Sequence, residues 1–169
     1  MIAAALPEME ALTREVGQSC HLAVHSAGEM LVIAQVDSSL QMGFAVHVGA
    51  RVGLLTSASG RVFLSFQKDD ERERVLALQG QPARPSTQAV TAFVARIQKS
   101  GYESVPSDLI RGVTNMSYPV LDSSGRCCAA LTIPFFQWDA DNHASKAVTR
   151  VRLGAAAQAV SSAIGALPE

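Results

Sequence analysis

The residue types of a hydrolytic active site are present in the sequence, but their spacing forms no catalytic motif. Ser59, Asp108 and a histidine are the components of a triad, yet such residues occur in almost any chain. The Gly-x-Ser-x-Gly turn that exposes a nucleophilic serine is absent. The glycine-containing region 49–60 lacks the Gly-Lys-Ser/Thr end of a phosphate-binding loop. We therefore expect a protein that is not an enzyme.

Histidines and cysteines form a second group of candidate functional residues, as potential zinc ligands. These residues are His21, His25, His47, Cys20, Cys127 and Cys128. No two of the cysteines have the Cys-x-x-Cys spacing of a zinc site, and buried cysteines commonly act as small apolar residues. Three cysteines also make no disulfide framework, which favours a reducing cytoplasm. We expect no metal site and no cofactor.

The composition indicates one globular domain over residues 1–169. A chain of 169 residues with 48% hydrophobic content is long and apolar enough to bury a core. The 14 basic and 15 acidic residues give a net charge of −1, and the basic ones are scattered. Binding to nucleic acid needs a basic patch, so this chain by itself is a poor candidate for it. No segment resembles a signal peptide or a membrane span.

The central elements are two β-rich segments around a glycine-containing turn. An alternating run covers Val113–Val120, a turn follows at 122–125, and an apolar run covers Cys127–Ile133. Gly125 can adopt the positive φ that such a turn often needs. This pattern predicts a β-hairpin within the stretch 101–134.

Hydrophobic periodicity predicts the remaining elements. A helical period ends at Gly17 and again at Gly101, with Ser86 as the N-cap of the second helix. A period of two predicts strands around Cys20–Val24, Met30–Val36 and Met42–Val48. A long alanine-rich helix over about 140–167 has two apolar rows, which favours a homo-oligomer. The fold class is α+β, with a mostly antiparallel sheet and grouped helices.

Three segments, in order and spacing, resemble the signature segments of one family. They read VGARVGLLTSASGRVFLSF, GYESVPSDLIRGVTNMSYPV and DSSGRCCAALTI. The family is the effector-binding domain of IclR-type bacterial transcriptional regulators, and the resemblance covers residues 6–167. It implies a GAF-like or profilin-like sheet of about six strands, with long helices at both ends.

The resemblance also implies an N-terminal winged helix-turn-helix that binds DNA and is absent from this chain. The sequence begins at the helix that would follow that domain. We therefore expect that the chain is a piece of a longer protein, and we regard a natural gene without a DNA-binding domain as the less favoured explanation. The implied partners are a small-molecule effector, a second or further copies of the chain in a homodimer or homotetramer, and DNA only through the missing domain.

The resemblance assigns the effector site position by position. The backbone N–H groups of Ala58 and Ser59 would bind a carboxylate, which suits the N-terminus of a helix. The other corresponding positions are Val105, Val113, Asn115, Thr132 and Pro134. Strand parity places Val113 with Asn115, and Thr132 with Pro134, on shared faces. None of these side chains titrates near neutrality, which again disfavours an enzyme.

Each of these residues also has a purely structural interpretation. Ser59 can be the N-cap of a helix that begins at Gly60. Asn115 can form a hydrogen bond to the backbone of a β-bulge, and Thr132 has a high propensity for strands whatever its function. Val105 and Pro134 replace polar contacts of the carboxylate-binding members, which implies a larger or more apolar acid, aromatic or aliphatic.

We expect the ligand to alter the arrangement of subunits and so to modulate operator binding. The alternative is that the chain is a free-standing GAF-like binding domain or an enzyme on that fold.

Overall fold

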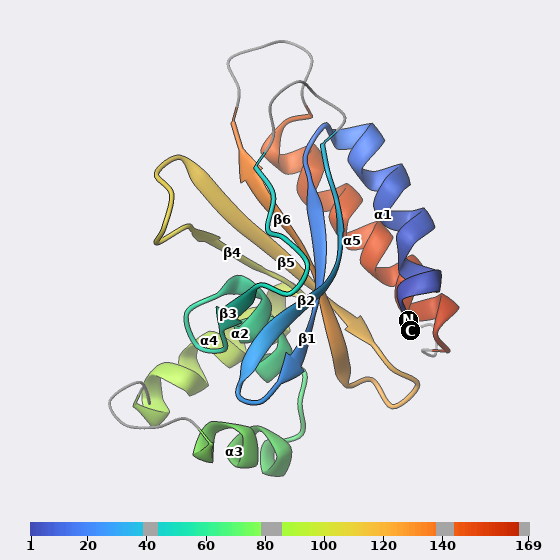
Figure 1. Cartoon of the computed structure of the whole chain (residues 1–169). Coiled ribbons are helices and arrows are strands. Elements are labelled where there is room, and N and C mark those ends of the chain that lie inside the picture. The colour runs from blue at the N-terminus through green and yellow to red at the C-terminus, as the bar shows by residue number, and fades with distance from the viewer. Residues whose placement is uncertain (39–43, 79–85, 138–143, 166–169) are drawn as a thin grey trace.

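The computed structural model describes residues 1–38, 44–78, 86–137 and 144–165. Its helices are α1 (Ile2–Val16), α2 (Ala58–Ser65), α3 (Asp69–Ala77), α4 (Thr87–Ser100) and α5 (Lys146–Ala163). Its strands are β1 (Cys20–Ser26), β2 (Glu29–Val36), β3 (Arg51–Gly53), β4 (Glu103–Pro106), β5 (Val113–Leu121) and β6 (Cys127–Phe136). The strands form one antiparallel sheet in the order β3-β2-β1-β6-β5-β4 (Figure 1). The predicted α+β class is confirmed.

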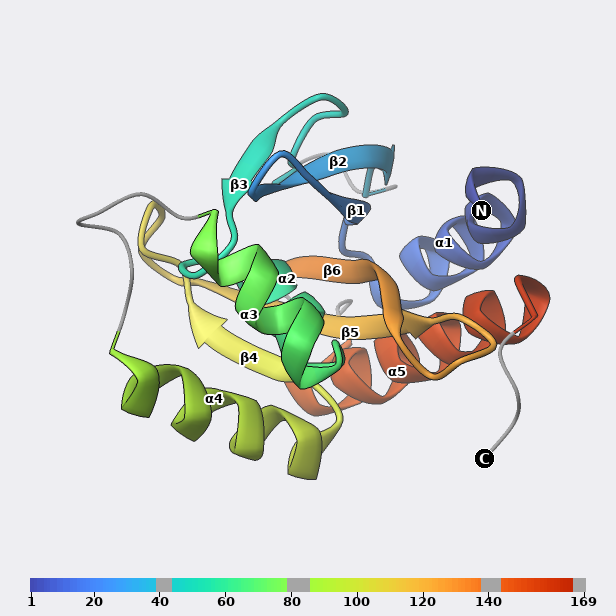
Figure 2. The same cartoon turned by 90° about the horizontal axis from the view of Figure 1, so that it is seen from below.

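The two faces of the sheet are covered by different helices (Figures 1 and 2). On one face α1 and α5 lie side by side and bury a core that includes Met9, Leu131 and Leu153. On the other face α2 lies directly on the sheet, with α3 and α4 outside it, around a core that includes Val62 and Ile97. Alternation along each strand produces this division, because successive side chains point to opposite faces.

Local signals in the sequence explain several element ends. Gly17 adopts φ 69° and donates its N–H to the Thr13 carbonyl, which ends α1. Ser86 accepts a hydrogen bond from the Ala89 N–H at the start of α4, and Gly101, at φ 81°, ends it. Gly125 adopts φ 74° in the β5–β6 turn. These predicted caps and the predicted hairpin are confirmed, since each depends on neighbouring residues alone.

The predicted strand over Met42–Val48 is wrong for the part that the structure describes. Residues 44–48 are not in a strand, and Met42 lies outside the described residues. The sheet is extended by β3 instead, after a turn in which the Ala50 N–H donates to the His47 carbonyl. The alternation of Phe44 and Val46 has another cause: both side chains line a cavity.

Two predicted helix starts are also corrected. The N-cap of α2 is Ser57, whose hydroxyl accepts from the Gly60 N–H at 3.0 Å, so Ser59 lies inside the helix. The last helix begins at Lys146 with Ser145 as its N-cap, whereas the prediction placed its start near residue 140. Residues 138–143 and 166–169 lie outside the described residues. Serine hydroxyl caps determine where both helices begin, and the periodicity of apolar residues gives no information about such caps.

Candidate functional site

A cavity of about 530 Å³ lies between the start of α2 and the face of the sheet beneath it. Its walls come from segments that are far apart in sequence: β1, β5, β6, the chain from residue 44 to 59 and the turn at 107–109. The lining residues are His21, Phe44, Ala45, Val46, His47, Ala50, Arg51, Val52, Gly53, Thr56, Ser57, Ala58, Ser59, Ser107, Asp108, Leu109, Asn115 and Thr132.

Four of the seven residues assigned from the sequence line this cavity. Ala58 and Ser59 lie at the start of α2, while Asn115 and Thr132 lie on β5 and β6. Val105 and Pro134 are the cross-strand partners of Asn115 on either side, yet neither lines the cavity. The same is true of Val113, which is buried.

The start of α2 is shaped by two serines and a glycine. The Ser57 and Ser59 hydroxyl oxygens lie 3.1 Å apart, and Ser57 caps the helix. The first N–H groups of a helix have no carbonyl partner within it, so this end carries unpaired donors and a partial positive charge. Gly60 lets the helix approach the Leu54 carbonyl too closely for any side chain. The geometry suits an anionic group at Ala58 and Ser59.

A row of buried polar side chains crosses the sheet beneath α2. His21 lies opposite Thr132, Thr132 lies opposite Ser117, and Ser117 lies opposite Glu103. The Ser117 and Thr132 hydroxyl oxygens are 2.9 Å apart. Polar groups buried in this way need partners. Ser117 and Thr132 satisfy each other, whereas Glu103 is paired with Arg96 and with the Ser104 N–H.

His21 is a buried residue of the cavity that was not assigned to the effector site from the sequence. Its side chain is 4% exposed, and its Nδ1 atom has no hydrogen-bond partner among the described residues. The alternation of His21 with Leu22 was visible in the sequence, but the pairing of β1 with β6 was not. A buried polar atom without a partner at a cavity wall is a candidate ligand contact.

Burial lowers the pKa of His21 from 6.5 to about 4, because the imidazolium loses its hydration in the interior. In acid the unfolded chain therefore takes up the proton before the folded chain does. The stabilisation from neutral His21 is complete above about pH 6.5 and is lost as the pH falls toward 4.

We expect His21→Gln to lose less stability in acid than the wild type. Between about pH 7.5 and pH 4.5 the free energy of unfolding of the wild type should fall by about 2 to 3 kcal/mol more than that of the variant. Urea unfolding at both pH values measures this difference. His47→Gln is the control, because His47 is exposed and should follow the wild type. Equal losses in wild type and His21→Gln would contradict the assignment.

Other titratable residues also reach the cavity, contrary to the expected lining without such groups. His47, Arg51 and Asp108 line it together with His21. The Ser59 hydroxyl lies at hydrogen-bond distance from the Ser57 hydroxyl, and within the described ranges no hydrogen bond joins it to a histidine. In the described part of the chain, no three histidine, cysteine or acidic side chains gather as metal ligands. None of the described helices is long and apolar enough to span a membrane.

The family model for the C-terminal part of bacterial IclR transcriptional regulators matches residues 1–162. Among curated proteins, the Escherichia coli regulator KdgR is 24% identical over 133 residues, covering 76% of this chain and 51% of that protein. Escherichia coli XynR is 26% identical over 159 residues, covering 91% of this chain and 63% of that protein. The chain thus spans about half to two thirds of the length of these relatives.

Solved structures share the fold. The C-terminal domain of Escherichia coli KdgR superposes with a TM-score of 0.78 at 23% identity, covering 97% of this chain and 98% of that one. An IclR homologue from Microbacterium hydrocarbonoxydans, complexed with 4-hydroxybenzoate, has a TM-score of 0.76 at 23% identity and covers 96% of this chain and 67% of that one. The relatives are transcriptional regulators and not enzymes. The chain belongs to the IclR C-terminal family of bacterial transcriptional regulators.

Proposed function

We propose that this chain is the effector-sensing domain of a cytoplasmic transcriptional regulator and binds a small organic acid in the cavity at the start of α2. The observation that carries the proposal is one cavity bounded by a helix N-terminus, by Asn115 and Thr132, and by the unpartnered Nδ1 of His21. Ligand sites are typically apolar with a few placed polar groups, as this one is. The structure of a relative with 4-hydroxybenzoate supports the ligand class.

The acid is expected to lie with its carboxylate at the N–H groups of Ala58 and Ser59. Phe44, Val46 and Val52 provide apolar wall for the body of the ligand. His21, Asn115 and Thr132 then contact a polar group at its other end. A volume of about 530 Å³ is much larger than a two-carbon acid needs, which favours an aromatic or longer aliphatic acid.

We expect calorimetry to show binding of 4-hydroxybenzoate or a medium-chain aliphatic acid and weak binding of glyoxylate. Asn115→Ala should lower the affinity of the bound acid about tenfold, the loss of roughly one hydrogen bond in a dry site. Thr91→Ala is the control, because Thr91 is exposed on α4 outside the cavity. Tight binding of glyoxylate with no binding of the larger acids would contradict the proposed ligand class.

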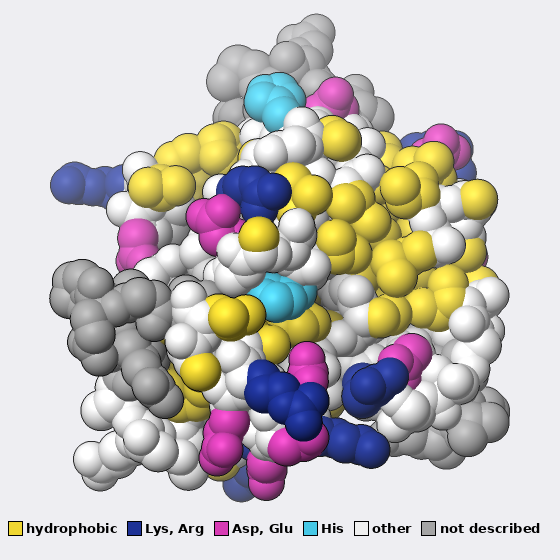
Figure 3. Space-filling model, turned by 60° about the horizontal axis from the view of Figure 1, so that its bottom comes forward, with side chains coloured by type: hydrophobic (Ala, Val, Ile, Leu, Met, Phe, Trp, Pro, Cys, Tyr) yellow, Lys and Arg dark blue, Asp and Glu magenta, His cyan; other side chains and the backbone are white. Residues whose placement is uncertain are grey.

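The regulatory step requires more than one copy of the chain. Val148 and Val151 on α5 are exposed, at 47% and 59%, although both are apolar. Figure 3 shows hydrophobic side chains gathered on the side of the molecule where α1 lies, whereas charged side chains gather below, over α3. We infer a homodimer or homotetramer through the α1 and α5 side. A monomer in light scattering at all concentrations, with and without ligand, would contradict this.

Effector binding then acts through differential affinity for two arrangements of the subunits. A ligand that favours one arrangement changes how the paired DNA-binding domains of the full-length regulator meet an operator. The net charge of −1 fits a chain that contacts DNA only through such a domain.

A further inference from the structure

A second cavity lies on the outer side of α2, between that helix and α4. It is an open groove of about 510 Å³, lined by Leu55, Thr56, Arg61, Ala89, Ala92, Phe93 and Arg96. Thr56 is the one described residue that lines both this groove and the effector cavity. The two sites therefore lie on either side of the chain that leads into α2.

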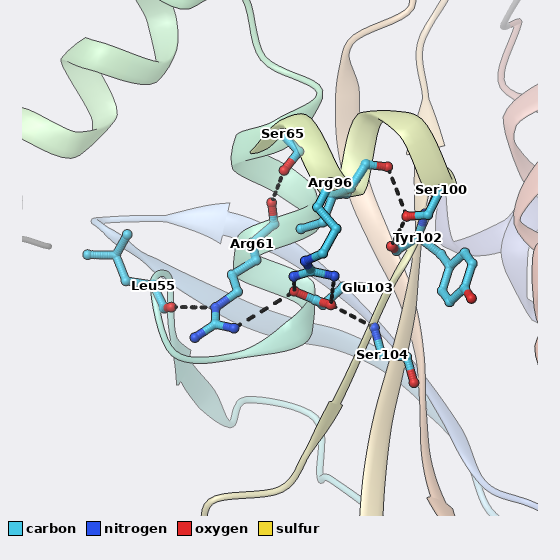
Figure 4. Close-up of polar contacts among 9 residues, drawn as sticks. Leu55, Arg61, Ser65, Arg96, Ser100, Tyr102, Glu103 and Ser104 are labelled. Atoms are coloured by element: carbon cyan, nitrogen blue, oxygen red, sulfur yellow. Dashed lines mark hydrogen bonds and ion pairs between the residues drawn. The ribbon is translucent and has the colours of Figure 1, made fainter. Parts of the chain in front are cut away.

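A buried carboxylate holds one of the two arginines of the groove and cancels its charge. Glu103 is 0% exposed and accepts hydrogen bonds from both terminal nitrogens of Arg96, at 2.8 and 2.6 Å (Figure 4). It also accepts the Ser104 N–H at 2.8 Å. This is a bidentate arginine–carboxylate ion pair, the geometry that holds a guanidinium most rigidly. Arg96 thus neutralises Glu103.

Arg61 is held in place without a close carboxylate of its own. Its Nε donates to the Leu55 carbonyl at 2.9 Å, and its Cζ lies 5.8 Å from the Phe93 ring centroid. Its Nη1 is 3.8 Å from the Glu103 carboxylate, which Arg96 already occupies. Figure 4 shows the other terminal nitrogen directed away from Glu103. Two guanidinium groups and one carboxylate leave one net positive charge, 2 − 1 = +1.

We propose that this groove is a second ligand site, for a small monocarboxylate with a flat apolar body. The carboxylate binds Arg61, whose planar donors suit it, and Arg96 adds positive charge. The body of the ligand lies against Phe93 and the two small residues Ala89 and Ala92. A monoanion balances the single excess charge, whereas a dianion would leave negative charge beside the buried Glu103.

Benzoate is the probe, and the test is a titration of the ¹⁵N-labelled chain followed by backbone amide shifts. In the wild type, shifts are expected at Ala89, Ala92 and Phe93. Arg61→Gln should weaken binding there about tenfold while leaving the Arg96–Glu103 pair in place. Arg14→Gln, on the exposed side of α1, is the matched control and should change nothing.

Two further variants and two further probes complete the test. Asn115→Ala should weaken any benzoate binding in the effector cavity and leave the groove unaffected, so the two proposals succeed or fail separately. Arg61→Lys, which keeps the charge but not the planar fork, should bind benzoate with intermediate affinity. Neutral benzamide and inorganic phosphate should both bind more weakly than benzoate. The proposal is overturned if the groove amides do not shift, if Arg61→Gln binds like the wild type, or if benzamide or phosphate binds as well as benzoate.

Discussion

Gly60→Ala is expected to destabilise the domain by about 3 kcal/mol or more, at the upper end of what overpacking does. A Cβ atom built at Gly60 would lie 2.1 Å from the Leu54 carbonyl oxygen and 2.6 Å from two other backbone atoms of Leu54. Backbone cannot move aside as the end of a side chain can. Relief of the clash requires α2 to lift away from the segment that it packs on, so ligand binding in the adjoining cavity should weaken as well.

The matched control for Gly60→Ala is the same substitution at Gly101. Gly101 has φ 81° with no atom within 4 Å of a built Cβ, so Gly101→Ala has a conformational cost of about 1 to 2 kcal/mol and no clash. Urea unfolding followed by circular dichroism measures both. If the two variants lose equal stability, the close approach of α2 to Leu54 is not the constraint that the structure indicates.

Arg96→Met should destabilise the protein by about 3 kcal/mol or more, because it leaves the Glu103 carboxylate buried without its close partner. Arg61, at 3.8 Å, compensates only in part. The double variant Arg96→Met with Glu103→Met is expected to be more stable than Arg96→Met alone, since removing both charges also removes the cost of burying one. Equilibrium unfolding of the wild type, the two single variants and the double variant forms a complete cycle.

Arg74→Met provides the surface comparison for this cycle. Arg74 pairs with Asp70 and Glu71 at 3.5 and 3.4 Å, and all three side chains are substantially exposed. Exposed pairs of this kind contribute at most about 1 kcal/mol. A loss for Arg96→Met no larger than for Arg74→Met would mean that Glu103 reaches water more readily than its complete burial indicates.

Much of the fold could be predicted from the sequence, since many of its determinants are local. The hairpin around Gly125 and the caps at Gly17, Ser86 and Gly101 each depend on a few consecutive residues. The prediction of a strand over Met42–Val48 was wrong because alternation of apolar residues indicates only that one side of the segment is buried. It does not indicate whether that side packs in a sheet or lines a cavity. Phe44 and Val46 face a cavity instead of a sheet partner.

The candidate site was harder to predict, because its residues meet only through tertiary structure. Strand parity placed Val113 with Asn115, and Thr132 with Pro134, on shared faces. Only Asn115 and Thr132 line the cavity, because its extent depends on how α2 lies over the sheet. His21 joins the site because β1 pairs with β6, and the carboxylate of Glu103 is buried because α4 brings Arg96 to it. Neither the pairing of β1 with β6 nor the Arg96–Glu103 ion pair can be predicted from residues that are adjacent in the sequence.

The alternation of the strands has a practical consequence for engineering a biosensor from this domain. His21, Asn115 and Thr132 face the cavity, whereas their chain neighbours Leu22, Met116 and Leu131 face the α1 and α5 layer. A mutant library restricted to His21, Asn115 and Thr132 would therefore vary the chemistry of the cavity while leaving the core beneath α1 and α5 intact. Selection for binding of a new ligand should then retain most library members as folded protein.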